Sequence, residues 1–201
     1  MLRPLHMAHA FLDEILTDQD LAVDATMGNG HDTLFLAQRA GKVVAFDIQE
    51  QALTTTAEKL EKAGLTNAQL VLTGHENLDQ YVDECKAAIF NLGYLPSADK
   101  SVITLPATTL QAIEKVLNRL VVGGRLAIMI YYGHEGGALE KDAVLDFISQ
   151  LDQTVFTAML YKPLNQVNTP PFLVMVERLK GSGKELEWSK KSSSSHPRTV
   201  D

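Results

Sequence analysis

A glycine-rich segment, Asp24-Ala-Thr-Met-Gly-Asn-Gly-His-Asp-Thr33, follows an apolar run near the start of the chain. Gly28 and Gly30 let the backbone approach a bound group that a Cβ atom would push away. The helix expected after them presents free N–H groups to an anion, and Asp24 could accept a hydrogen bond from an ammonium group. The segment therefore fits a zwitterionic amino-acid group better than a pyrophosphate. The alternative is a tight strand–helix turn, capped by Asp32 or Thr33.

Asp47 ends the second apolar run, nineteen positions after Gly28. An acid at about that distance from a glycine turn can bind a ribose, because one carboxylate accepts hydrogen bonds from both hydroxyls. The alternative is a helix N-cap before Gln49, and Asp47 could do both. The turn and the acid together indicate an adenosine cofactor, either S-adenosylmethionine or NAD. The turn lacks the third glycine of a dinucleotide fingerprint, which favours S-adenosylmethionine.

The segment Thr73-Gly-His-Glu-Asn77 follows the third apolar run, where proteins of this kind contact adenine. Gly74 permits close approach, and His75 could hydrogen-bond to the base or stack on it. A surface loop with a helix cap at Asn77 is the alternative.

The segment Phe90-Asn-Leu-Gly-Tyr-Leu-Pro96 ends the fourth apolar run and predicts the catalytic residues, Asn91 and Tyr94. Methyltransferases that act on amino groups place Asn or Asp here, followed by a turn and an aromatic residue. The amide oxygen accepts the hydrogens of the amine, so that its lone pair points at the methyl carbon, and Tyr94 could stack on a flat base. Alignment of this kind can supply most of the acceleration of an in-line displacement. The alternative is a turn formed by Asn91 and Gly93, and the variant Asn-Leu-Gly-Tyr leaves the substrate class open.

Two later segments, Tyr131-Tyr-Gly-His134 and Asn168-Thr-Pro-Pro-Phe172, are expected to cover the substrate as loops. His134 is a candidate base or RNA contact, or else the cap of the following turn. His6 and His9 stand at helical spacing without a third ligand, so we expect no metal site. The expected substrate-binding residues are Tyr132, His134, Asn168, Pro170 and Pro171.

The elements that must position these residues alternate in type along the chain. Apolar runs at 21–25, 43–46, 69–72, 87–90 and 126–131 predict buried strands, and the ranges 51–63, 108–120 and 141–151 have helical spacing. This alternation predicts an α/β fold with a parallel sheet and helices on both faces. The runs 154–161 and 172–177 have no helix between them and predict a final antiparallel hairpin, as in S-adenosylmethionine methyltransferases.

The composition of the 201 residues is that of an ordinary globular protein, and it predicts one domain over 1–179 with a flexible, possibly non-native tail over 180–201. A single cysteine, Cys85, excludes an internal disulfide and suits the cytoplasm. No apolar run is long enough to span a membrane, and no leader is apparent. Residues 1–179 hold 13 basic and 22 acidic residues, so bulk charge would not hold nucleic acid.

Taken together, these motifs resemble the YtqB-like family of rRNA methylases, whose MnmM-type members methylate a tRNA wobble uridine. The likeness covers about residues 1–179. It implies a class I S-adenosylmethionine methyltransferase fold, and methylation of the aminomethyl nitrogen of 5-aminomethyl-2-thiouridine in the tRNA anticodon loop. By resemblance, Asn29, Asp47, Gln49 and His75 bind the cofactor, and Met27, where relatives often have Asn, would contact it through the backbone. The expected cofactor-binding residues are Asp24, Met27, Gly28, Asn29, Gly30, Asp32, Thr33, Asp47, Gln49, Gly74 and His75.

Three functions stay open at this point. The favoured one is the tRNA N-methyltransferase, as a monomer or a homodimer. The second is a methyltransferase of the same fold that acts on rRNA or a small amine. The third is an NAD-dependent reductase or a non-catalytic adenosine-binding module. With so acidic a chain, an RNA enzyme must recognise a small, splayed-out target by stacking and local contacts, and a wobble base is such a target.

Overall fold

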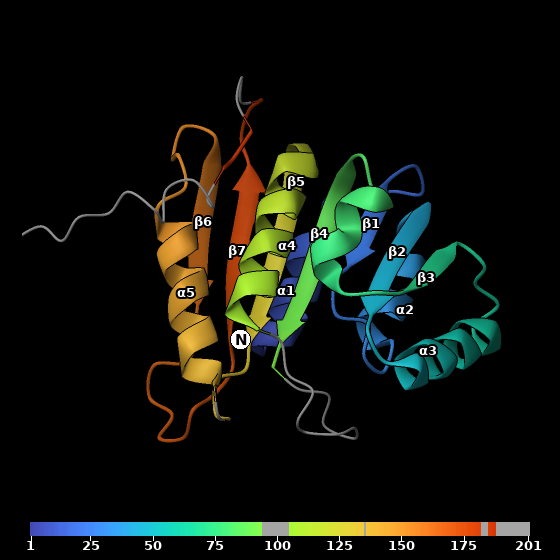
Figure 1. Ribbon diagram of the computed structural model, residues 1–201, viewed down its shortest axis with the longest axis horizontal. Helices are drawn as coiled ribbons and strands as arrows, with labels where there is room; N and C mark the ends of the chain where they lie inside the picture. The colour runs from blue at the N-terminus through green and yellow to red at the C-terminus, as the bar shows by residue number, and fades with distance from the viewer. Residues whose placement is uncertain (94–104, 135, 182–184, 188–201) are drawn as a thin grey trace, which may run out of the picture.

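The computed structural model describes residues 1–93, 105–134, 136–181 and 185–187. Its strands form one seven-stranded sheet in the order β3-β2-β1-β4-β5-β7-β6 (Figure 1). The strands are β1 (Leu21–Asp24), β2 (Lys42–Asp47), β3 (Ala68–Leu72), β4 (Cys85–Leu92), β5 (Leu120–Ile130), β6 (Phe156–Tyr161) and β7 (Phe172–Arg178). The α-helices are α1 (Pro4–Asp13), α2 (His31–Ala37), α3 (Glu50–Lys62), α4 (Pro106–Arg119) and α5 (Gly137–Ser149), and a 3₁₀ helix, η1, spans His75–Gln80.

The first five strands pair in parallel, whereas β7 pairs antiparallel with both β5 and β6. The sequence-based prediction of a mostly parallel α/β sheet with an antiparallel C-terminal hairpin is therefore confirmed. The hairpin inserts β7 next to β5 and leaves β6 at the edge. The boundaries differ slightly from the prediction: Leu120, expected to end a helix, is the first residue of β5, because apolar residues at a helix–strand junction suit either element.

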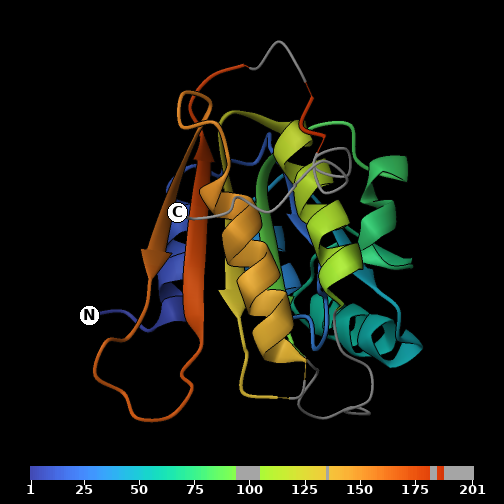
Figure 2. The ribbon, with the colours of Figure 1, turned by 60° about the vertical axis from the view of Figure 1, so that its left-hand side comes forward.

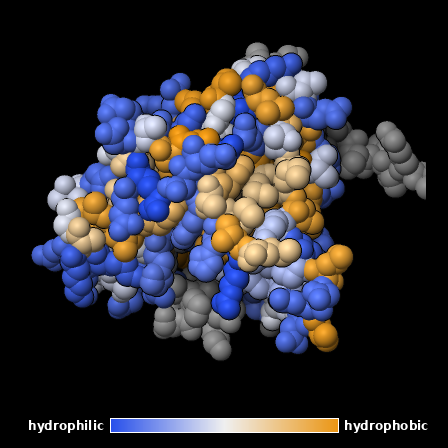
Figure 3. All heavy atoms as spheres, turned by 180° about the vertical axis from the view of Figure 1, so that it is seen from behind, coloured by the Kyte–Doolittle hydropathy of each residue, from blue (hydrophilic) through white to orange (hydrophobic). Residues whose placement is uncertain are grey.

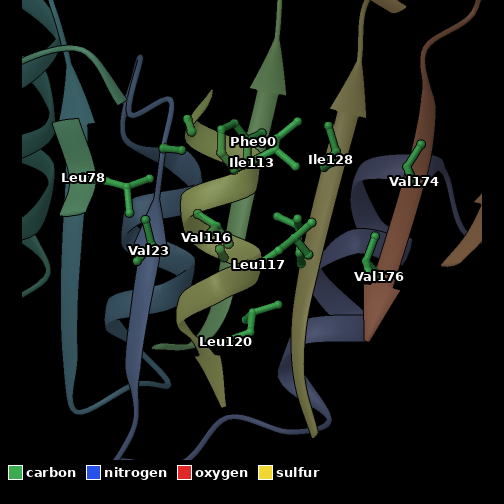
Figure 4. Close-up of a cluster of buried hydrophobic side chains, with 14 of the residues drawn as sticks. Val23, Leu78, Phe90, Ile113, Val116, Leu117, Leu120, Ile128, Val174 and Val176 are labelled. Carbon is green, nitrogen blue, oxygen red and sulfur yellow. The ribbon is translucent and has the colours of Figure 1, made fainter. Parts of the chain in front are cut away.

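Helices cover both faces of the sheet, as the near-continuous apolar strands require. On one face, α4, α5 and η1 pack on a cluster that includes Phe90, Ile113, Leu117 and Ile128 (Figures 2 and 4). On the other face, α1, α2 and α3 pack on a second cluster with Leu12, Leu36 and Leu60. The sheet is therefore clamped between two layers, and the C-terminal ends of β1 to β5 are delivered to one edge.

Helix α1 is fixed to the sheet by Arg125 of β5. Its guanidinium donates to the Phe11 carbonyl at 2.8 Å and to the carboxylates of Glu177, at 2.9 Å, and Glu14, at 2.5 Å. Proline at the first turn suits the helix start, where no backbone donor is needed. This anchoring places the N-terminal helix against the sheet close to α2.

Leu186, in the predicted tail, makes ordered contacts that the composition of the segment did not reveal. The backbone of Leu186 donates to the side-chain oxygen of Asn118 at 2.8 Å and accepts from its nitrogen at 3.2 Å. The Leu186 side chain packs against the first core cluster. Leu186 thus contacts the domain from within the segment predicted to be a flexible tail, and a lone apolar residue between two acids has no periodicity to signal such a contact. Positions 188–201 lie outside the described residues.

In the part of the chain that the structure describes, no helix combines the length and apolar character needed to cross a lipid bilayer. Seen from behind, hydrophilic residues cover most of the left-hand part of the surface, and hydrophobic residues form a connected area to the right of the centre (Figure 3).

Candidate active site

A cavity of about 630 Å³ opens at the edge of the sheet where the parallel strands end. Its volume lies in the range of small-ligand sites. Its wall combines residues from the ends of β1, β2, β4 and β5 with the glycine turn and η1. The predicted site residues on this wall are Met27, Gly28, Asn29, Asp32, Asp47, Gln49, Gly74, His75, Asn91, Tyr132 and His134.

The carboxylate of Asp47 joins the glycine turn to the end of β2. One oxygen accepts the backbone N–H of Gly28 at 2.9 Å, and the other accepts the N–H of Gln49 at 3.0 Å. A carboxylate oxygen has two lone-pair directions, so each oxygen can still accept one hydroxyl. The two alternatives of the sequence analysis coexist here, since Asp47 orders the start of α3 and still faces the cavity.

The glycine turn needs its glycines for different reasons. Gly28 lies on the cavity wall with φ of 52°, and Gly30 adopts φ of 73° as the residue before α2. A Cβ atom on Gly30 would lie 2.5 Å from the Thr56 hydroxyl oxygen. Gly28 thus exposes backbone to a ligand, whereas Gly30 is absent from the wall and permits close packing of α3 against the turn. The direct ligand contact expected of Gly30 is revised accordingly.

Asp24 and Thr33 also lie behind the wall, and the structure corrects their expected direct contacts. Both are fully buried. The Thr33 hydroxyl donates to one Asp24 oxygen at 2.6 Å, and the Thr26 N–H donates to the other at 3.1 Å. Burial, followed by the charge of Asp32, raises the pKa of Asp24 to about 7. Asp24 therefore supports the turn from inside, because the last side chain of β1 points into the protein rather than towards the cavity.

The side chain of Met27 is buried in the second core cluster, although the residue borders the cavity. Its N–H donates to the Phe46 carbonyl at 2.9 Å, and its carbonyl accepts the Gly30 N–H at 2.8 Å. The backbone donor of Met27 is therefore already used, and its predicted backbone contact with a cofactor can come only from the carbonyl.

His75 is buried at the start of η1 and faces the cavity. Its Nδ1 lies 3.1 Å from the Ala25 carbonyl, which fixes Nδ1 as the donor. Burial lowers the pKa of His75, so the ring is neutral and Nε2 is an acceptor. A Cβ atom on the neighbouring Gly74 would lie 2.2 Å from a Glu76 carboxylate oxygen, so a side chain there would displace the carboxylate of Glu76.

Asn91 lies on the cavity wall, near the end of β4. Its backbone N–H donates to the Thr26 hydroxyl at 2.6 Å, and its side-chain nitrogen donates to Asp32. A carboxylate accepts and does not donate, so the amide is oriented with its nitrogen towards Asp32. No described residue donates a hydrogen bond to Oδ1, which is left to accept from a ligand. Tyr94, the other predicted catalytic residue, lies outside the described residues.

The roof is formed by the loop after β5 and by the segment before β7. Tyr132 packs edge-on against Phe172, with ring centroids 5.6 Å apart. From the second segment, Thr169 is on the cavity wall, whereas Asn168, Pro170 and Pro171 are not. Thr169 meets the neighbouring loop, where a Cβ atom on Gly133 would lie 2.6 Å from its hydroxyl oxygen. The contacts of the other three residues with a substrate stay a prediction.

Several wall residues were not anticipated from the sequence. Ile48, which follows Asp47 and is 60% exposed, presents an apolar side chain to the cavity. Its place directly after the acid that is expected to bind the ribose could have indicated this. Leu5 of α1 also lines the cavity. No local pattern indicated Leu5, because its position depends on how the first helix packs.

Known proteins are similar to this chain both in fold and in sequence. The family described as "Putative rRNA methylase" matches residues 43–177. A tRNA (mnm(5)s(2)U34)-methyltransferase, chloroplastic, of Arabidopsis thaliana is 32% identical over 187 residues, which cover 86% of this chain and 68% of that protein.

Two solved bacterial structures are more similar still. A methyltransferase of Streptococcus mutans in complex with SAH is 60% identical with a TM-score of 0.85, covering 89% of this chain and 99% of that one. An rRNA methylase of Streptococcus thermophilus is 66% identical with a TM-score of 0.80, covering 90% and 99%.

These likenesses agree with the sheet order, the antiparallel β7 and the ligand cavity at the strand ends. They confirm the predicted class I fold and the prediction of an S-adenosylmethionine-dependent methyltransferase, and they leave no support for an NAD-dependent reductase. The chain belongs to the rRNA methylase family of S-adenosylmethionine-dependent methyltransferases.

Proposed function

We propose that the protein methylates the aminomethyl nitrogen of 5-aminomethyl-2-thiouridine at the wobble position of tRNA, forming the methylaminomethyl nucleoside. The observation that carries the proposal is the orientation of Asn91, whose amide nitrogen is held by Asp32 while its oxygen faces the cavity as a hydrogen-bond acceptor. An acceptor beside a carboxylate suits a group that brings N–H donors and positive charge, which is an alkylamine. The Arabidopsis relative is named for the same product.

The residues of the cavity fit S-adenosylmethionine from end to end. The two remaining acceptor positions of Asp47 match the two ribose hydroxyls, and Ile48 offers an apolar surface to the adenine beside them. Neutral His75 has Nε2 available to accept from the adenine amino group. The glycine turn at Gly28 leaves backbone room for the methionine end. When bound, the cofactor would supply an electrophilic methyl group for transfer.

Asn91 acts on the substrate side. Its oxygen accepts one N–H of the amine and thereby directs the nitrogen lone pair towards the methyl carbon. Holding the two reacting atoms in line and in contact converts a bimolecular reaction into one within a complex, which is a large contribution in group transfer. The Thr26 hydroxyl fixes the backbone of Asn91 at 2.6 Å, so the acceptor is positioned before the substrate arrives.

The mouth of the cavity suits a single exposed base of the anticodon loop. Tyr132 lines it with an aromatic ring, and the Nζ atoms of Lys141 and Lys162 lie 5.3 and 5.9 Å from the centre of that ring. Aromatic stacking and a few local cations are how single-stranded RNA bases are held. We propose that residues 1–179 form the catalytic domain and that tRNA is the partner.

Nucleoside mass spectrometry tests the proposal. Purified protein is incubated with S-adenosylmethionine and tRNA that carries 5-aminomethyl-2-thiouridine, and the nucleosides are then analysed. We expect the methylaminomethyl nucleoside to form with the wild-type protein and not with Asn91→Ala. Ribosomal RNA from cells lacking the protein is the comparison substrate: methylation of that RNA, with tRNA left unchanged, would replace the proposal with the rRNA activity that the family description names.

A further inference from the structure

Asp32 sits between the cavity and the N-terminal helix and makes two hydrogen bonds that the methyl-transfer geometry alone does not require. One carboxylate oxygen accepts from the side-chain nitrogen of Asn91, and the other lies 2.5 Å from Nε2 of His9. The Asp32 side chain is 8% exposed and lines the cavity. A buried carboxylate is thus held beside the atom that is proposed to receive the substrate amine.

His9 is itself held rigidly. Its ring stacks on Phe35 with a centroid separation of 3.9 Å and an angle of 6° between the planes. The guanidinium of Arg39 lies 4.1 Å from the centre of the Phe35 ring. Because a carboxylate accepts hydrogen bonds and does not donate them, Nε2 of His9 carries the hydrogen and donates a hydrogen bond to Asp32. The contact joins α1 to α2 and holds the first helix at the border of the site.

The chemistry of the proposed substrate gives a proton acceptor at this position a function. An alkylamine is protonated at neutral pH, as the Lys side chain is, and an ammonium nitrogen has no lone pair with which to attack. A carboxylate within reach of the nitrogen can both attract the cation and remove its proton.

We propose that Asp32 accepts the proton that the substrate ammonium must lose, and that His9 is the positioning residue that holds the Asp32 carboxylate for this step. The proposal rests on the proposed function, since it assumes an amine substrate. The proton moves from nitrogen to an Asp32 oxygen. The freed lone pair then forms the N–C bond while the S–C bond breaks and its electron pair stays on sulfur. The product is a secondary ammonium, and Asp32 returns its proton to water.

The groups that face Asp32 support this role. From β1, Asp24 has its pKa raised to about 7 by burial and then by the Asp32 charge. Directly after β5, Tyr131 has its pKa raised by burial and by the same charge. Asp24 and Tyr131 are thus the neighbouring titratable groups whose pKa values respond to the negative charge of the Asp32 carboxylate.

The test compares rates at several pH values with saturating cofactor and tRNA carrying 5-aminomethyl-2-thiouridine. The main variant is Asp32→Asn, which keeps the size of the side chain and one acceptor oxygen but cannot take a proton. We expect it to lose about 100-fold or more in kcat at about pH 7.5. The loss should shrink by about tenfold per pH unit up to about pH 9.5, because the free amine then forms in water. Asp24, whose pKa is about 7, completes its ionisation at the low end of this range, and the raised pKa of Tyr131 keeps its hydroxyl protonated.

His9 supplies the matched variants. His9→Ala should lower kcat less than Asp32→Asn does and leave the affinity for S-adenosylhomocysteine unchanged, whereas His9→Gln, which retains a side-chain N–H donor, should restore most of the rate. His6→Ala is the control, since His6 is on the same helix and exposed. If Asp32→Asn does not fold, the pH profile of His9→Ala decides instead, with the same expected decrease of the loss at high pH.

The outcomes separate the two claims. A loss in Asp32→Asn that is equal at every pH would mean that Asp32 only orients Asn91, and the proton-transfer role would be overturned. A rate in His9→Gln as low as in His9→Ala would overturn the positioning role of His9. A wild-type protein that leaves this tRNA unmethylated would remove the proposed function, and this inference with it.

Discussion

The backbone N–H of Gly28 donates to the carboxylate of Asp47 at 2.9 Å, across nineteen residues of sequence. This bond joins the turn after β1 to the end of β2, and so couples the two parts of the cavity that are proposed to hold the methionine and ribose groups. The second Asp47 oxygen accepts the Gln49 N–H at 3.0 Å. The carboxylate is therefore fixed before a ligand binds, and little ordering is needed on binding.

Asp47→Ala should weaken binding of S-adenosylmethionine by about 1–3 kcal/mol, since hydrogen bonds to a charged group would be lost in a partly buried site. Isothermal titration calorimetry with S-adenosylhomocysteine measures this directly. Glu50→Ala is the matched control, because Glu50 is an exposed acid in the first turn of α3. An unchanged affinity in Asp47→Ala would show that the carboxylate does not hold the ribose.

The strand-end residues could be predicted from sequence because a parallel sheet delivers the C-terminal ends of its strands to one edge. Asp47, His75 and Asn91 each follow an apolar run, so their approach to one another required no knowledge of packing. The same reasoning failed for Asp24. A residue at the end of a strand points to one side or the other, and a one-residue difference decides between the cavity and the interior.

The N-terminal helix illustrates what sequence pattern could not supply. His9 and Asp32 are 23 residues apart, and the pairing depends on where α1 packs on the sheet, which Arg125 of β5 helps to fix. Thr169 was missed for a related reason, since the expected contacts were its neighbours Asn168 and Pro170. The segment was correctly chosen, but only the packing against Gly133 selects the residue that faces the cavity.

Asn91→Ala should leave the affinity for S-adenosylmethionine nearly unchanged and remove most of the turnover. The side chain is proposed to contact the amine and not the cofactor, and its loss takes away the acceptor that aligns the nitrogen. Positioned groups of this kind are worth about 100-fold or more in kcat. Single-turnover methylation of tRNA together with calorimetry separates the two effects. If the variant methylates at the wild-type rate, Asn91 is not part of the reaction.

Asp24→Asn should change how stability depends on pH. The pKa of Asp24 is about 7 in the folded protein and about 4 in an unfolded chain, so the folded state binds more protons between these values. The free energy of unfolding therefore falls as pH rises from about 4 to about 7. Asparagine does not titrate, so the free energy of unfolding of the variant does not show this decrease with rising pH.

Thermal unfolding of both proteins between about pH 5 and about pH 8 checks the Asp24 prediction. The melting temperature of Asp24→Asn, minus that of the wild type, should become more positive as pH rises. The lowered pKa of His75 acts in both proteins and cancels in the difference. A difference that is constant across the range would contradict a raised pKa for Asp24.

Lys162→Ala should weaken tRNA binding and leave cofactor binding intact. The Lys162 ammonium lies 5.9 Å from the centre of the Tyr132 ring and 5.5 Å from that of Phe172, at the mouth of the proposed substrate site. A lysine that neutralises one phosphate releases one counterion, so its loss should reduce the slope of log affinity against log salt by about 1. Fluorescence anisotropy with a labelled anticodon stem–loop at several salt concentrations measures the slope.

Lys62→Ala is the control, because Lys62 is an exposed residue at the end of α3, near the edge of the sheet that lies opposite to β6 (Figure 1). Equal slopes for Lys162→Ala and the wild type would place the RNA elsewhere on the surface.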